Sequence, residues 1–519
     1  MPRELAMEAV DDLAKAAHAD ALDAAQRRDA APSAAWRDAL RPLALAALAL
    51  VALPGYVALA GLAHPDGTTP PPNGPVALML ALVVPYGAAC WLVLARPRPL
   101  ARLWRRVEWG TLVVAAVAFR AVLAPARPQL SKDAYRYLWD ARLIAHGYSP
   151  YLHGPNWPGF AHLRDAALYP LVPWKDVPTI YPPAAQLLYR VADAFAPGNV
   201  VGIKVEMLLC DLLVCGLLAL LLRQRGQDPR RAIIYLWAPL PIVEFALNGH
   251  EDAAAIACMV AALLVNGARW RGARAVVGVL LGVATLIKLY PVVLVVALWR
   301  RRDWPLLAGL ALTITAGYAP FWRDGLAATG FLSIYLTEVN INYGGALLLL
   351  RWLGQALGAQ TRAVQLAGAA GAALGLGVLA WLRLDPARRP SPRWLTRARP
   401  ALGPAGAAAG IVALWLAFSP HVFPWYAAAL LPFCALFLAR RDHPLSSALA
   451  LGAWTFCGVM PLAYGAFAAP ALAWLYPTLY LVALVATLGA YAWQGRARLA
   501  SVLDAARTVA ASTKKGIAR

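Results

Sequence analysis

The chain of 519 residues is 61% hydrophobic and only 14% charged, whereas soluble domains carry about 25% charged residues. This composition excludes an ordinary soluble protein and indicates an integral membrane protein that folds as one polytopic helical bundle. The net charge of +21, from 48 Lys and Arg against 27 Asp and Glu, would suit a nucleic-acid partner. Because the arginines cluster in short loops between apolar runs, the Lys and Arg enrichment of cytoplasmic loops explains the charge better, and we expect no nucleic-acid partner.

The cysteines and the N-terminal segment carry no sign of export or of a metal centre. All six cysteines lie inside apolar runs without CxxC or Cys/His spacing, which predicts small buried hydrophobes. A polar, Ala-rich segment of mixed charge precedes the first apolar run, so we expect no cleavable signal peptide. We interpret 1–39 as a cytoplasmic segment, 40–493 as the membrane domain and 494–519 as a basic cytoplasmic tail.

A membrane span needs about 20 apolar residues, and a series of apolar runs approaches that length. The runs are 40–62, 75–96, 109–126, 199–222, 232–247, 252–267, 274–299, 304–321, 364–382, 401–419, 422–439, 445–465 and 471–493. Arginine-rich loops assign the sides by the positive-inside rule. The loops predicted to be cytoplasmic are RPRPLARLWRRVEW, RQRGQDPRR, GARWRGAR, WRRRDW, RLDPARRPSPRWLTRARP, ARRDH and the tail after Gln494.

Two segments cannot be single membrane crossings if all the arginine-rich loops are to lie on the cytoplasmic side. GARWRGAR and WRRRDW are both predicted to be cytoplasmic, yet the single run 274–299 lies between them. KLYP interrupts this run, and proline breaks a helix, so we predict a helical hairpin whose tip lines a protein-enclosed cavity. The run 344–357 is predicted to be a re-entrant or interfacial helix. The sum is about 14 passes, counting the hairpin as two, with both termini cytoplasmic.

The remaining segments are predicted to be extracytoplasmic. They are 63–74, 127–198, 248–251, 288–291, 322–345, 419–421 and 466–470. Nearly every unusual polar residue falls in this set, which predicts one site on the outer face of a plasma-membrane protein.

Asp133 lies a few residues after the third apolar run, in SKDAYRYLWDARLIAHGYSPY (131–151). Ser131 or Asp133 could cap a helix that ends at Gly147, or Asp133 could be catalytic; the residues leave both open. The helix is amphipathic, and several of its apolar residues are available to face lipid, namely Tyr137, Leu138, Leu143 and Ile144.

The segment VEFALNGHEDAAAIA joins two apolar runs and carries Glu244, Asn248, His250, Glu251 and Asp252. Ionisable groups at membrane depth indicate a functional site. A capped turn is the alternative, but it does not account for Glu244, about one turn inside the span. A metal site from His250, Glu251 and Asp252 is weakly supported, because adjacent helical residues point in different directions.

Further polar residues belong to the same predicted face. Lys288 needs an anionic partner such as phosphate or snorkels to the interface, and Arg120 has the same ambiguity. In YPPAAQ, Tyr181 and Gln186 could line a polar pocket, whereas the prolines stiffen the entry to a helix. Other outer segments add Glu338, Asn340, Asn342, Tyr343, His421, Trp425 and Tyr426, of which the aromatic residues are ordinary in an interfacial belt.

No Walker A motif and no GxGxxG after a strand is present. An enzyme outside the cytoplasm would lack nucleotide-sugars in any case. A lipid-borne donor, its phosphate held by cationic side chains, suits an outer-face site.

The motifs SKDAYRYLWDARLIAHGYSPY, YPPAAQ, EFALNGHEDAAAIA, KLYPVVLVV and SPHVFPWYAAALLP, in this order, resemble the bacterial polyprenol-phosphate-mannose-dependent mannosyltransferases. These are relatives of the family 87 glycosyltransferases of the GT-C superfamily, and the resemblance covers roughly residues 110 to 490. It implies a GT-C fold of about 12–14 transmembrane or re-entrant helices, with an interfacial helix in the first large outer loop.

The resemblance also implies an activity. Sugar, expected to be mannose, would pass from a polyprenyl-phosphate-sugar to an acceptor hydroxyl by inverting displacement, with Asp133 as general base. The leaving phosphate is already acidic and needs no general acid, and nearby cations would stabilise its charge. The residues expected to bind donor or substrate are Lys288, Arg136, His250, His421, Tyr181, Glu251, Tyr290 and Asn342.

One position departs from the family pattern. Many relatives place two adjacent acids in this loop, whereas Lys132 precedes Asp133 here. We therefore expect no metal or other cofactor, and interpret Asp140 as a helix-surface partner of Arg136 or Arg142. The partners expected are a lipid-linked donor, a glycan or lipid-linked acceptor, and membrane lipids.

Two other functions fit the same residues. A transporter or flippase of a lipid-linked substrate would also use intramembrane charges and broken helices, although we see no inverted repeat. A relative that has lost activity is the third possibility.

Overall fold

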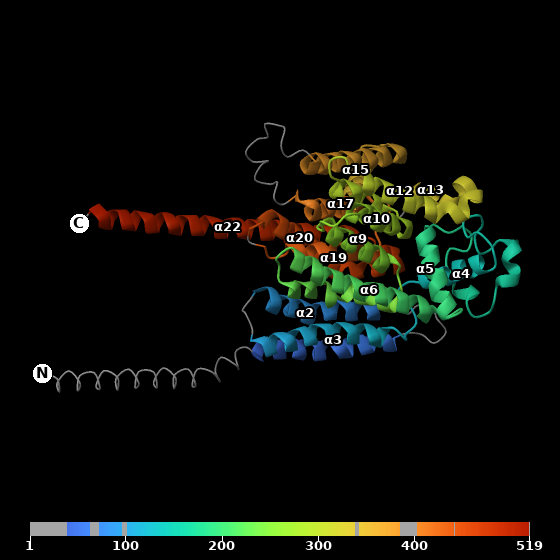
Figure 1. The fold of residues 1–519 in the computed structure, drawn as a ribbon, viewed down its shortest axis with the longest axis horizontal. Helices are drawn as coiled ribbons and strands as arrows, with labels where there is room; N and C mark the ends of the chain where they lie inside the picture. Colours follow the sequence, from blue (N-terminus) through green and yellow to red (C-terminus); the bar gives the residue numbers. More distant parts are fainter. Residues whose placement is uncertain are drawn as a thin grey trace.

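The computed structural model describes residues 39–62, 72–95, 101–337, 342–384, 402–440 and 442–517. In these parts of the chain every regular element is helical, and the helices lie alongside one another in an elongated bundle (Figure 1). The predicted all-α polytopic fold is confirmed. The N-terminal segment 1–38, Glu338 and Asn340 fall outside the described residues.

Seven helices in the described ranges are long and apolar enough to cross a membrane. They are Ala39–Gly61, α2 (Asn73–Ala95), α6 (Val200–Gln224), α12 (Trp304–Tyr318) with the turns after it, α15 (Thr361–Leu384), α20 (Pro444–Val459) with α21 (Ala463–Ala468), and the first part of α22 (Leu475–Ile517). Shorter apolar helices are α9 (Asp252–Asn266), α10 (Ala273–Ile287), α17 (Pro404–Phe418), and α18 (Pro424–Ala427) with α19 (Leu431–Phe437). Each predicted apolar run falls on one of these, on α3 (Arg102–Leu123), or on the broken helix 233–247.

The broken helix 233–247 consists of α7 (Ile233–Leu236), α8 (Pro239–Pro241) and a π-helical turn, Ile242–Leu247. Its two prolines remove backbone donors, and π-turns inside helices often mark functional sites. Gly249 follows with φ +78°, a left-handed conformation that lets the chain reverse into α9. The fully buried Glu244 is thereby placed close to this reversal.

The run 274–299 forms the predicted hairpin. After α10 the chain passes Lys288 and returns through the 3₁₀ turn Tyr290–Leu294 and α11 (Val295–Leu298). Arg274, at the start of α10, donates a hydrogen bond to the carbonyl of Leu298 at the end of α11 (2.8 Å). The chain has therefore come back to the end from which it entered, and the prediction is confirmed.

The helix α14 (Gly345–Ala356) follows the short α13 (Leu332–Thr337). Its twelve residues measure about 18 Å, too short for a hydrocarbon core of about 30 Å. The amide of Gly344 donates to the carbonyl of Ser419 (2.9 Å), at the end of α17. The structure agrees with the prediction that this segment does not cross the membrane.

Residues 127–198 form a lobe at one end of the bundle (Figure 1). The lobe contains α4 (Asp133–Ala145), α5 (Pro183–Phe195) and the 3₁₀ turns Pro158–Leu163 and Tyr169–Leu171. The rings of Tyr137 in α4 and Tyr189 in α5 stack at 4.3 Å, which joins the two helices.

The helix α4 was predicted to turn an apolar face toward lipid, and this was wrong. Tyr137, Leu138 and Leu143 are at most 1% exposed, and Ile144 is half-buried. The helix packs against α5 and α6, because the long loop supplies the apolar cover that lipid was expected to provide.

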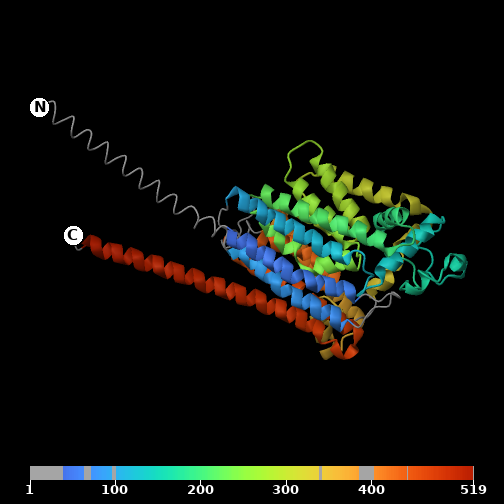
Figure 2. The same cartoon turned by 90° about the horizontal axis from the view of Figure 1, so that it is seen from below.

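The arginine-rich loops gather at the opposite end. Glu108 binds Arg41 and Arg230, both at 2.9 Å, and Arg231 donates to the carbonyl of Ala435 (2.8 Å). Loops predicted to share one side therefore meet there, away from the lobe 127–198 (Figure 2). The helix α22 continues without a break to Ile517 and projects beyond this end, where the sequence predicted a span followed by a tail.

A fully buried ion pair joins α3 to α6. Arg120 Nε lies 2.5 Å from Asp211 Oδ2, and Arg120 Nη1 donates to the carbonyl of Leu236 (2.8 Å). This resolves the ambiguity over Arg120, which neither snorkels nor faces the predicted site.

We predict that Asp211→Ala will destabilise the detergent-solubilised protein by about 3–5 kcal/mol, because it leaves the buried charge of Arg120 without a partner. Thermal unfolding measures the change. The double variant Arg120→Met/Asp211→Leu removes both charges and should recover most of the stability. A single variant as stable as the wild type would contradict the structural role of this pair.

Candidate active site

A cavity of about 610 Å³ lies where the lobe 127–198 meets the bundle. Asp133 and Lys288 are among the polar residues that line it. The rest of the wall comes largely from apolar and aromatic side chains, including Leu376 of α15 and Leu414 of α17. A cavity of this kind, mostly apolar with a few converging polar groups, is typical of a small-molecule site.

Asp133 is the first residue of α4, and 18% of its side chain is exposed. Its backbone amide donates to Ser131 Oγ at 3.2 Å, while the residue before it, Lys132, makes no side-chain cap. Ser131 therefore satisfies the helix start. The Asp133 carboxylate is free to face the cavity, which favours the catalytic alternative over the capping one.

Burial, and after it the nearby carboxylate of Glu251, raise the pKa of Asp133 to about 7. The ammonium of Lys288 opposes this shift without cancelling it. A carboxylate of this pKa changes its charge near neutral pH, as a general base at physiological pH should.

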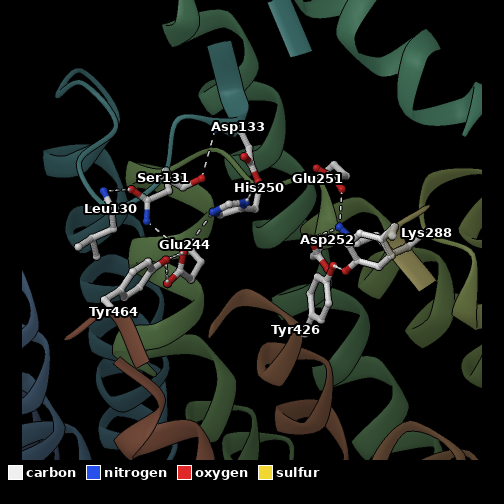
Figure 3. A network of polar contacts seen from close by, with 12 residues as sticks. Leu130, Ser131, Asp133, Glu244, His250, Glu251, Asp252, Lys288, Tyr426 and Tyr464 are labelled. Carbon is white, nitrogen blue, oxygen red and sulfur yellow. Dashed lines mark hydrogen bonds and ion pairs between the residues drawn. The ribbon is translucent and has the colours of Figure 1, made fainter. Parts of the chain in front are cut away.

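His250 lies behind Asp133 and is fully buried (Figure 3). Its Nδ1 is 3.9 Å from Asp133 Oδ2, and its Nε2 is 3.4 Å from Glu244 Oε2. The ring stacks on Trp425 at 3.7 Å, which fixes its plane. The imidazole faces two carboxylates and is absent from the cavity wall, so this position does not suit the phosphate-binding role expected from the sequence.

Glu244 is held on both of its oxygens by Tyr464 Oη (2.9 Å to each) and by the Asn248 amide (3.0 Å). The Asn248 side-chain oxygen in turn accepts hydrogen bonds from the backbone amides of Gln129 and Leu130, at 3.3 and 3.2 Å. The π-turn and the chain leading to Asp133 are thus joined by one side chain. The sequence singled out Glu244 and Asn248, but nothing in it indicated Tyr464, which lies more than 200 positions away.

Lys288 has two carboxylate partners (Figure 3). Its Nζ lies 2.5 Å from Glu251 Oε1 and 3.0 Å from Asp252 Oδ2, and 5.0 Å from the centre of the Tyr426 ring. The anionic partner predicted for this lysine is present within the protein. Because an ammonium has three donors, one N–H remains for a ligand in the cavity.

Arg136 also reaches the cavity, but its guanidinium holds the protein together. Its Nε binds Asp140 Oδ1 at 2.9 Å, which confirms one of the two partners expected for Asp140. The pair is buried, so the expected position at the helix surface was wrong. Its Nη1 donates to the carbonyl of Trp174 (2.7 Å) and its Nη2 to that of Val177 (3.1 Å). The arginine therefore positions the loop at 174–177.

Tyr181 lines the cavity, and its ring packs edge-on against Tyr137 at 4.9 Å. Its carbonyl accepts hydrogen bonds from Tyr151 Oη (2.9 Å) and from Gln186 (3.2 Å). The predicted pocket position of Tyr181 agrees with the structure, whereas Gln186 is buried behind it as a structural donor.

His421 and Asn342 meet at another part of the wall. His421 Nε2 lies 2.8 Å from the carbonyl of Tyr335, to which it must donate, and Nδ1 lies 3.3 Å from the side-chain oxygen Oδ1 of Asn342. Val422 also donates to the Asn342 carbonyl (2.7 Å). Only His421 of this pair lines the cavity, so Asn342 supports the histidine.

Tyr290 leads into the apolar part of the cavity. Its ring stacks on Trp415 at 3.7 Å, and its hydroxyl donates to Met259 Sδ at 3.2 Å. The hydroxyl is bound to the methionine sulfur, and the ring forms part of the apolar wall. Within the described residues, no three His, Cys, Asp or Glu side chains are grouped to hold a metal ion.

Residues 43–301 match the family model of the alpha-(1->6)-mannopyranosyltransferase N-terminal domain. The chain belongs to this family of mannosyltransferases. The match includes the π-turn, Glu251, Asp252, and the cavity residues Asp133 and Lys288, whereas His421 of the cavity wall lies outside the matched region. No curated protein sequence matches the chain.

In this mannosyltransferase the ion pair of Lys288 gives a direct prediction. Lys288→Ala should lower the thermal stability of the purified protein, because Glu251 and Asp252 are then buried without a cation. The triple variant Lys288→Met/Glu251→Gln/Asp252→Asn removes the charges together and should recover stability. Equal melting temperatures for wild type and Lys288→Ala would contradict this ion pair.

Proposed function

We propose that the chain transfers mannose from a polyprenyl-phosphate-mannose to a hydroxyl of a mannose-containing acceptor on the extracytoplasmic face of the plasma membrane. The transfer inverts the anomeric centre, with Asp133 as general base, and forms an α-(1→6) linkage as the family description states for its members.

The observation that carries this proposal is the continuity of the cavity. Asp133 and Lys288 line the same cavity as the apolar side chains of Leu376, Ile411 and Leu414 on α15 and α17. A polyprenyl phosphate has this same division into a charged head and a long apolar chain. The helices that form the apolar wall are also predicted to lie in the membrane, where the lipid chain would enter.

The face of the membrane is inferred from charge. The loops rich in arginine lie at the end of the bundle opposite the cavity. Because cytoplasmic loops carry the excess of Lys and Arg, the cavity belongs to the extracytoplasmic side. A lipid-linked donor suits that side, which lacks nucleotide-sugars.

The transfer is a single displacement. The acceptor oxygen forms a bond to the anomeric carbon, the bond from that carbon to the phosphate oxygen breaks, and its electron pair leaves with the phosphate. Asp133 takes the proton of the acceptor hydroxyl. The remaining N–H of Lys288 is placed to stabilise the charge on the leaving phosphate.

We further propose that His250 and Glu244 support the base. If Nε2–H points at the Glu244 carboxylate, Nδ1 offers a lone pair to Asp133, which can pass on the proton that it has accepted. The imidazolium would then lie between two carboxylates. The 3.9 Å from Asp133 to Nδ1 is longer than a hydrogen bond, but catalytic hydrogen bonds often tighten only in the reacting complex.

The function is tested with the purified protein, radiolabelled polyprenyl-phosphate-mannose and α-(1→6)-linked mannose oligosaccharides. We expect transfer by the wild type and a loss of at least about 100-fold in Asp133→Asn, the usual scale for removal of a general base. Because the base must be ionised, kcat/KM should fall about tenfold per pH unit below a pKa of about 7 and level off above it.

The matched control is Asp165→Asn, which removes a carboxylate of the same lobe outside the cavity. It should keep normal activity. Full activity in Asp133→Asn would exclude Asp133 as the base, and movement of the lipid across vesicles without sugar transfer would replace the proposal with a transporter.

The role of His250 is tested with a double-mutant cycle. His250→Gln and Glu244→Gln should each lower kcat about 10- to 100-fold with KM unchanged, and the double variant should lose little more, because both act in one proton path. Steady-state kinetics measure the effects. Losses that multiply would show that His250 and Glu244 act independently of each other, and a change in KM alone would show that they bind substrate instead of serving a proton path.

A further inference from the structure

Trp174 has a backbone conformation that its side chain disfavours. Its φ is +55°, in the left-handed region where a bulky residue is a genuine outlier, at a cost of about 1–2 kcal/mol. Its side chain is nevertheless 55% exposed, so burial of the indole does not repay that cost. Such an outlier, kept where glycine would fit without strain, points to a function of the side chain.

The surrounding loop holds Trp174 firmly in this conformation. Arg136, anchored by Asp140, donates to the carbonyls of Trp174 and Val177. The next residue, Lys175, accepts a hydrogen bond from the backbone amide of Asn156 at 2.8 Å. At Gly154, an added Cβ would lie 2.7 Å from the backbone of 175–177. The backbone at Gly154 therefore packs closely against the segment that follows Trp174. The indole is therefore presented on a rigid support.

Trp174 lines the same cavity as Asp133. Trp174, Arg136 and the segment 179–182 all line the cavity, and all of them belong to the lobe 127–198. The apolar wall is contributed by α15 and α17, which belong to the bundle (Figure 1). If the lipid chain of the donor packs against α15 and α17, the part of the cavity wall that the lobe contributes is available to bind the acceptor.

We propose that Trp174 is the stacking platform for a pyranose ring of the acceptor glycan, placing its hydroxyl toward Asp133. This inference rests on the proposed function and names the residue that binds its acceptor. The C–H face of a pyranose is apolar and flat enough to lie on an indole, and an aromatic side chain offers a large contact area. A platform that is already rigid loses little conformational entropy on binding.

The test is Trp174→Gly. Glycine fits φ +55° without strain, so the variant should fold at least as stably as the wild type, as its melting temperature will show. With linear α-(1→6)-linked mannose oligosaccharides as acceptor, KM for the acceptor should rise about tenfold, the scale of an aromatic contact of about 1.4 kcal/mol. KM for polyprenyl-phosphate-mannose should not change, and Trp174→Tyr should restore most of the acceptor affinity.

The matched control is Trp270→Gly, because Trp270 has nearly the same exposure, 54%, and lies in a loop between α9 and α10 at the arginine-rich end. It should leave both KM values unchanged. A rise in the donor KM alone would make Trp174 a contact for the lipid and overturn the proposal. Unchanged KM values in Trp174→Gly would also overturn it.

A second measurement does not depend on transfer. Saturation-transfer NMR of the oligosaccharides with the wild type should show binding that Trp174→Gly loses and Trp270→Gly keeps. If the wild type binds in this way but transfers nothing, the proposed function fails and the sugar platform stands. If binding is equal in wild type and Trp174→Gly, the platform fails whatever the activity.

Discussion

The contact of Lys288 with Glu251 and Asp252 is the interaction on which the site depends. An ammonium and two carboxylates cannot be buried singly in so apolar a bundle, but at 2.5 and 3.0 Å the ammonium of Lys288 offsets one of the two negative charges and binds both carboxylates. The contact ties the hairpin tip after α10 to the start of α9. Since carboxylates still outnumber the ammonium around Asp133, that group is left in a negative environment, which together with burial raises its pKa toward neutrality.

Breaks in the helices bring these groups close together. Pro239 and Pro241 precede the π-turn, and Pro291 interrupts the hairpin. Irregular backbone within a membrane domain is tolerated where it is enclosed by protein or lines a cavity. The break before Pro291 thus lets Lys288 face the cavity, and the π-turn places Glu244 beside His250, outside the cavity wall.

The lobe 127–198 positions Asp133 and the loop that carries Trp174. Burial of α4 against α5 and α6 fixes Asp133 at the helix start, and the guanidinium of Arg136 fixes the loop that carries Trp174. A base placed by a buried helix is more precisely positioned than one on a helix floating at the lipid surface. Rigid support on the lobe side and apolar walls on the bundle side therefore suit two substrates of different chemistry.

The sequence by itself determined the helical membrane fold, the hairpin at KLYP and the concentration of polar groups at one end. Hydrophobic run length and arginine position follow directly from the requirements of the bilayer, so these features need no tertiary information. The sequence also identified Asp133, Glu244 and Lys288, because ionisable groups in apolar surroundings are conspicuous.

Only the tertiary structure decided what each of these groups faces. His250 lies between two carboxylates, Arg136 binds backbone carbonyls, and α4 is covered by its own lobe rather than by lipid. Tyr464 and Trp425 are brought to Glu244 and His250 from more than 170 positions away. Helical periodicity describes the faces of one segment, whereas partners of this kind are set by how distant segments pack, for which a single sequence carries no local signal.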